Sequence, residues 1–96
     1  MTTIIGYANY GVLAHEKQTI FTISNEHAYA SVSEKVEITL PENWNVHENN
    51  FGFLIESPEG NLYKADEIIS SWDDNPVLSW YDGDKTNRIK LDWKAL

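Results

Sequence analysis

Apolar and polar residues alternate along much of this chain, and this alternation predicts β-strands. In the clearest run, residues 36–40, Val, Ile and Leu alternate with Glu and Thr until Pro41 ends the pattern. Extending this run backward puts Glu34 out of pattern, so we expect a bulge near Ser33–Lys35. A second strand is predicted at Thr19–Ile23, which is rich in β-branched residues, and a first strand within Thr3–Leu13, interrupted at one of that segment's two glycines.

Two β-hairpins are predicted in the second half of the chain. The first turns at Ser57-Pro58-Glu59-Gly60, because proline suits the first central position of a turn and glycine the left-handed position that follows. Its strands are expected at residues 51–56 and 61–64. The second hairpin joins residues 77–81 to residues 88–93, whose Ile, Leu and Trp side chains are expected to face the core.

One segment has a helical period instead. Over residues 65–72, either Ile68 or Ile69 shares a helical face with Trp72, and the early acids suit a helix N-terminus. We therefore expect a two-turn helix whose Trp72 packs on the sheet. Residues 42–50 lack a period and are rich in asparagine, which favours a loop.

These elements predict a mainly β fold of the α+β class. We expect one domain over residues 1–96: a small antiparallel sheet or partial barrel of six to seven short strands, with one short helix near residues 65–72. The chain has no cysteine, which excludes disulfides and thiolate metal sites. Its first residues lack the pattern of a signal peptide, and no apolar run is long enough for a membrane helix, so we expect a cytoplasmic protein, in the host cytoplasm if phage-encoded.

Charge is distributed unevenly along the chain, whose formal net charge is -8. Residues 1–41 carry four acids and two lysines, residues 42–84 carry ten acids and Lys64 alone, and residues 85–96 carry four bases and Asp92. The net charges of these segments are -2, -9 and +3. Such an acidic middle favours a basic partner and disfavours direct binding to nucleic acid, whose phosphates it would repel.

Known catalytic and metal-binding patterns are missing from the sequence. The three histidines are scattered, and Asp82–Asn87 resembles the start of a calcium loop but has Asn87 where glycine is required. There is no nucleophile elbow and no glycine-rich phosphate loop. We therefore expect a non-enzymatic protein without a cofactor or metal.

The leading hypothesis is a small acidic protein-binding domain that meets a basic surface of its partner. If the acids converge on one face, they would resemble a phosphate backbone and could occupy the basic surface of a nucleic-acid-handling protein, as an inhibitor would. Anti-CRISPR, anti-restriction and immunity proteins share this charge and size, although no family motif is present. Trp44, alone in a polar segment, is the expected aromatic anchor, with carboxylates pairing with partner Lys or Arg. The expected partner-binding residues are Trp44, Glu48, Glu59, Asp73, Asp74, Asp82 and Asp84.

Two other functions remain open. A carbohydrate- or small-ligand-binding β module would stack a sugar on Trp44, beside Asn and Glu side chains. A structural or assembly component, of a phage or of an oligomer, would use an unpaired strand near Thr3–Ile5 to join a neighbouring subunit. For Trp44 itself, the alternative to an exposed anchor is a side chain that folds back over the core.

Overall fold

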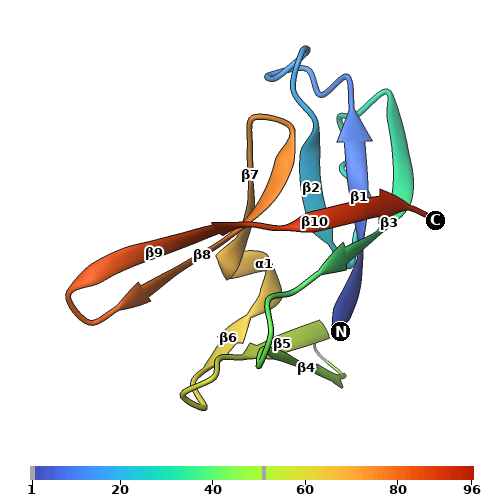
Figure 1. The fold of residues 1–96 in the computed structure, drawn as a ribbon. Coiled ribbons are helices and arrows are strands. Elements are labelled where there is room, and N and C mark those ends of the chain that lie inside the picture. The colour runs from blue at the N-terminus through green and yellow to red at the C-terminus, as the bar shows by residue number, and fades with distance from the viewer. Residues whose placement is uncertain (1, 51) are drawn as a thin grey trace.

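Ten short strands and one short helix make up the part of the chain that the computed structural model describes, residues 2–50 and 52–96 (Figure 1). The expected mainly β fold with one short helix is confirmed. The strands form three antiparallel sheets, however, and not one sheet or a partial barrel. There are also more strands than the six or seven expected, because two segments expected as loop and helix contain strands and the predicted last strand is divided into two.

The largest sheet has four strands in the order β10-β3-β1-β2. The central strand β1 runs without a break through Gly6, whose missing side chain lets β2 approach: a Cβ at this position would lie 2.7 Å from the Thr22 carbonyl oxygen. The expected interruption therefore falls only at Gly11, which follows the end of β1 and has a φ of +68°. The strands of this sheet are β1 (Thr3–Tyr10), β2 (Ile20–Ile23), β3 (Val32–Thr39) and β10 (Asp92–Ala95).

The bulge expected near Ser33–Lys35 is not found, because β3 pairs with β1 in unbroken register from Val32 to Thr39. Glu34 fits on the core side of the sheet because the Tyr10 hydroxyl donates a 2.6 Å hydrogen bond to its Oε1. This hydrogen bond, together with burial and the negative charge of Glu34, raises the pKa of Tyr10 to about 12. A partly buried hydrogen bond thus takes the place of the predicted backbone irregularity.

The second sheet has the order β4-β5-β6. Its β5–β6 hairpin confirms the first predicted turn, and Gly60 adopts the expected left-handed conformation with a φ of +88°. The loop expected over residues 42–50 is wrong for most of its length, because Asn45–Asn49 pair with β5 as an edge strand. The strands of this sheet are β4 (Asn45–Asn49), β5 (Gly52–Glu56) and β6 (Leu62–Lys64).

The third sheet, in the order β7-β8-β9, corrects the predicted helix. Helix α1 (Ala65–Ile68) has a single turn, and the chain continues directly into β7 (Ile69–Trp72). The second predicted hairpin is present as β8 (Asn75–Asp82) and β9 (Lys85–Lys90), which extend as an arm from the rest of the molecule (Figure 1). The predicted last strand is divided at the buried Leu91, after which β10 joins the four-stranded sheet.

A shared core lies between the three sheets and α1. The indole of Trp44 belongs to it and packs edge-on against Trp80, with ring centroids 4.8 Å apart. Phe21 and Trp93 form a similar pair at 4.9 Å. The buried apolar residues of this core are Ile4, Ala8, Phe21, Ile23, Val36, Ile38, Leu40, Trp44, Ile55, Ala65, Ile68, Ile69, Leu78 and Leu91.

Among the described residues, no helix is long and apolar enough to cross a membrane.

Candidate functional site

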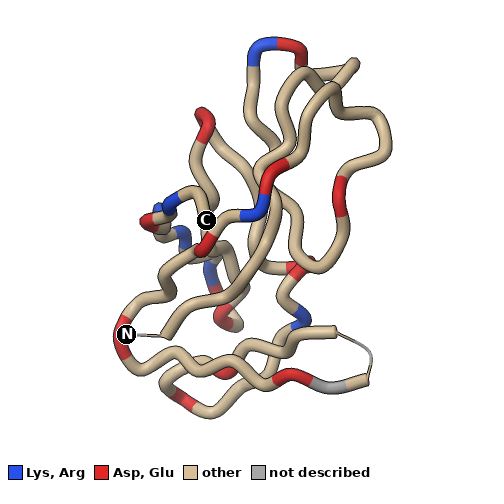
Figure 2. The backbone as a smooth tube through the Cα atoms, turned by 90° about the vertical axis from the view of Figure 1, so that its right-hand side faces the viewer, with Lys and Arg blue, Asp and Glu red and all other residues tan. Residues whose placement is uncertain are grey.

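The predicted acidic residues lie on three separate parts of the molecule. Glu48 is on β4 and Glu59 is in the β5–β6 turn; the two aspartates 73 and 74 form the β7–β8 turn, and Asp82 and Asp84 lie at the tip of the β8–β9 arm. Figure 1 shows these three turns at different extremities of the fold. Acidic segments are likewise spread over the backbone in Figure 2. The structure therefore does not gather the predicted residues into one continuous patch.

One predicted binding residue, Asp74, has a structural contact. Its Oδ1 accepts a 2.6 Å hydrogen bond from the backbone N–H of Thr19, and the hydroxyl oxygen of Ser71 accepts another of 2.6 Å from the N–H of Phe21. In an antiparallel edge strand, every second backbone N–H group points away from the paired strand. These two bonds therefore give acceptors to the outward N–H groups at the start of β2. Asp74 thus joins the third sheet to the first.

Trp44 is not an exposed anchor. Only 4% of its surface is accessible, and the ring lies against Trp80 in the core. The preceding residue, Asn43, has a φ of +68°, and the Trp44 N–H donates to the Pro41 carbonyl oxygen at 3.3 Å, so a tight turn leads the chain back to the core. The alternative in which Trp44 covers the core is the one observed, and a sugar-stacking face at this residue is excluded by its burial.

The exposed tryptophan of the described chain is Trp72, with 75% of its surface accessible. In the predicted helix it would face the sheet, but β7 alternates with period two and places Trp72 with Ser70 on the outer face. A groove of about 460 Å³ follows this face, and Tyr81, 64% accessible, stands on the same face nearer the arm's tip. The groove is lined by Ser70, Ser71, Trp72, Val77, Ser79, Arg88 and Lys90.

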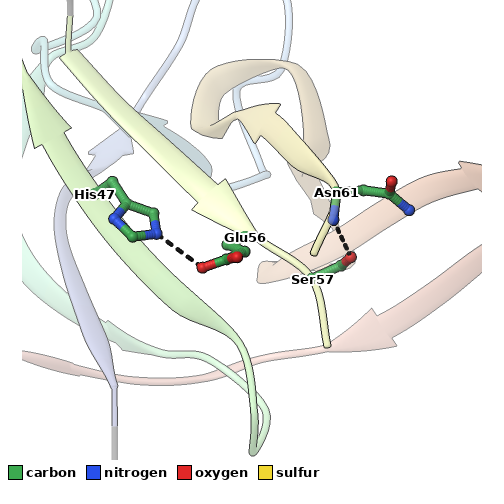
Figure 3. Close-up of polar contacts among 4 residues, drawn as sticks. All are labelled: His47, Glu56, Ser57 and Asn61. Atoms are coloured by element: carbon green, nitrogen blue, oxygen red, sulfur yellow. Dashed lines mark hydrogen bonds and ion pairs between the residues drawn. The ribbon is translucent and has the colours of Figure 1, made fainter. Parts of the chain in front are cut away.

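Carboxylates outnumber the basic side chains of the sheet β4–β6 and its turn. Residues 45–64 contain three glutamates, Glu48, Glu56 and Glu59, and one lysine, Lys64. In the described part of the chain the structure shows one ion pair, between His47 Nε2 and Glu56 Oε1 at 2.9 Å (Figure 3). This contact involves one of the three glutamates, so the other two have no ion-pair partner among the described residues.

The turn that presents Glu59 is fixed by its own hydrogen bonds. The buried Ser57 accepts a 3.1 Å hydrogen bond at its hydroxyl oxygen from the Asn61 N–H (Figure 3), and the backbone groups of the same two residues are joined at 2.8 Å. Glu59 lies at the exposed tip of this turn. Of the predicted residues, Glu48 and Glu59 therefore belong to the same sheet.

Sequence reasoning missed Trp72 because the helical interpretation of residues 65–72 placed it in the core. Residues 68–72, Ile-Ile-Ser-Ser-Trp, do not alternate, so the sequence carries no period-two signal for β7; the adjacent β-branched pair, a type that favours strands, is the one local indication. Among the described residues, no group of three or more His, Asp or Glu side chains could hold a metal ion.

Comparisons with known proteins give no further assignment. No family model matches the chain, and the searches of curated proteins and of solved structures found no match.

Proposed function

We propose that this chain is a small, non-enzymatic protein-binding domain that docks on a basic surface of a partner protein. The observation that carries the proposal is the uncompensated acidic charge: fifteen acids face seven bases, and the one ion pair of the described chain involves a histidine. Exposed carboxylates left free in this way produce a negative potential that attracts a basic partner and speeds its approach.

Trp72 is the anchor of this proposal in place of Trp44. Tryptophan, tyrosine and arginine are the residue types most enriched among the energetically dominant residues of interfaces. Trp72, Tyr81 and Arg88 share the outer face of the third sheet, and the aromatic side chains are well exposed. The nearby Arg88 and Lys90 favour a partner whose surface around the indole is acidic or neutral, while its basic groups meet the carboxylates elsewhere.

The partner's basic surface could be one that binds nucleic acid, in which case this domain acts as an inhibitor of the anti-CRISPR, anti-restriction or immunity-protein kind. The three separate acidic turns support contacts at several points of such a surface and argue against a single phosphate-like stripe. The assembly alternative stays a prediction: Thr3–Ile5 pair with residues 37–39 of β3 along one edge, and the pairing of β1 with β2 along the other edge covers only Gly6–Asn9.

Affinity capture from the source organism's lysate tests the proposal, with wild type, Trp72→Ala and Leu13→Ala as baits. Leu13 is a matched control because it is also well exposed, at 72%, but lies in the loop after β1. We expect a captured basic protein whose affinity falls by about tenfold or more for Trp72→Ala, as for a dominant interface residue, and is unchanged for Leu13→Ala. Equal capture by all three baits would contradict the role of Trp72, and capture that is insensitive to salt would contradict the electrostatic proposal.

A further inference from the structure

A pocket of about 440 Å³ lies beside β2, between the loop that follows this strand and helix α1. Its apolar side is formed by Phe21 and Ile23 of β2 and by Ile69 of β7. Its polar side comes from two elements: Glu26 and Tyr29 of the loop, and Asp66 of α1. None of the acidic residues predicted from the sequence lines this pocket.

The loop wall is held in place by a buried asparagine. Asn9 is fully buried, and its Oδ1 accepts hydrogen bonds from the His27 N–H at 3.0 Å and from the Ser33 hydroxyl at 2.5 Å. Its Nδ2 donates to the Ile20 carbonyl oxygen at 2.7 Å and to Thr22 Oγ1 at 3.0 Å. A wall fixed by this network is preorganised, so a ligand does not have to order it on binding.

The ring of Tyr29 is available to a ligand. The residue is 69% exposed, and its backbone N–H donates to His27 Nδ1 at 3.2 Å, which ties the residue to the loop. The two rings meet edge to face with centroids 6.0 Å apart. Because Nδ1 accepts this bond, the neutral imidazole carries its hydrogen on Nε2.

The lining combines the groups that recognise a long cationic side chain. Carboxylates from two different elements can accept hydrogen bonds from a cation, the aromatic face attracts it, and the apolar residues accommodate an alkyl stem. No lysine or arginine lines the pocket. A guanidinium fits this set better than an ammonium, since it is planar, stacks on aromatic rings and presents five donors that can reach more than one carboxylate.

We infer that this pocket receives an arginine side chain of a partner protein, with the guanidinium between Glu26, Asp66 and the Tyr29 ring. The inference rests on the proposed function, since it names the chemical group of the basic partner that this domain recognises.

Nuclear magnetic resonance titration of the full chain with N-acetyl-arginine methylamide tests the inference. Its neutral isostere, the citrulline compound, and the corresponding lysine compound are the reference ligands. We expect saturable shifts of the backbone amides of residues 21–29 and 66–69 at millimolar ligand, with affinity at least about tenfold weaker for citrulline and measurably weaker for lysine. Equal affinities for arginine and citrulline, equal affinities for arginine and lysine, or shifts centred elsewhere would overturn the assignment.

Charge variants separate the pocket from a general effect of the negative charge. Glu26→Gln and Asp66→Asn are each expected to weaken the arginine compound by about threefold, the size typical of an exposed ion pair. Glu16→Gln, in the exposed loop after β1, removes the same charge outside the pocket and should leave the affinity unchanged. If Glu16→Gln weakens binding as much as Glu26→Gln, the pocket is not the site. Because this titration needs no partner protein, its failure would leave the Trp72-dependent capture experiment unaffected.

Discussion

Replacing Asn9 by alanine should be among the most damaging polar substitutions in this protein. The side chain makes four hydrogen bonds, and it joins β1 to β2, to β3 and to the loop after β2. The Ser33 and Thr22 hydroxyls can turn to other partners, and the Ile20 carbonyl keeps its backbone bond to residue 9 in the β1–β2 ladder. The partly buried His27 N–H, however, loses the acceptor that it has in the structure. An unpaired group costs about 1–3 kcal/mol and the lost bond to Ile20 about 1 kcal/mol more, so we expect a loss of roughly 3 kcal/mol.

Urea denaturation followed by circular dichroism measures this loss of free energy of unfolding. In thermal denaturation, the same 3 kcal/mol corresponds to a fall in Tm of roughly 12–24 °C for a domain of this size. Ser33→Ala removes one of the four bonds and should cost only about 1 kcal/mol, and the exposed Asn45→Ala should change stability by less than about 0.5 kcal/mol. A loss below about 1 kcal/mol for Asn9→Ala would refute the role given to the network. Where Asn9→Ala remains folded, it should also weaken the arginine compound, since the pocket wall is no longer held.

Three further predictions follow from the packing. Trp44→Ala should lower the free energy of unfolding by about 3–5 kcal/mol because it empties a core position, whereas Trp72→Ala should change it by less than about 0.5 kcal/mol. Trp72→Ala should also remove the part of the tryptophan fluorescence that acrylamide quenches most readily. Similar losses of stability for both variants would contradict the placement of the two side chains. Tyr10 should ionise only near pH 12 in an absorbance titration, and Glu34→Gln should lower that pKa. Because the folded-state pKa lies above the ordinary value of 10.0, the stabilisation from this hydrogen bond is complete below pH 10 and is lost as the pH rises towards 12; an unchanged titration in the glutamine variant would argue against the bond. Gly6→Ala should destabilise by about 1–3 kcal/mol, since its Cβ would lie 2.7 Å from a backbone oxygen of β2, and a neutral result by thermal denaturation would show that the strands can separate without cost.

Much of the fold was predictable where a local pattern and the tertiary environment agree. The alternation at residues 36–40 and the proline–glycine turn at residues 57–60 gave correct strands and a correct hairpin. Residues 45–49 show the opposite case. Their polar side chains suggest a loop, but the backbone of β5 offers a pairing partner, and backbone pairing does not depend on side-chain polarity.

The candidate site was harder to predict, because it depends on residues that are distant in sequence. Trp44 is buried because the chain turns at Asn43, and Trp72 is exposed because helix α1 ends after one turn. The hydrophobic period of these segments does not by itself predict the turn or the end of the helix. The pocket proposed to receive arginine is lined by the loop after β2 and by α1. No spacing in the sequence indicates that Glu26 and Asp66 line the same pocket. Whether the acidic turns converge also depends on the tertiary structure, which places them in separate sheets.

The central claim is that uncompensated carboxylates drive association with a basic partner. Its most direct test is the dissociation constant of the captured complex, measured by calorimetry from about 50 mM to about 500 mM NaCl. The account predicts that the affinity falls by about tenfold or more across this range, because salt screens exposed charges. An affinity that stays constant as the salt concentration rises would contradict it.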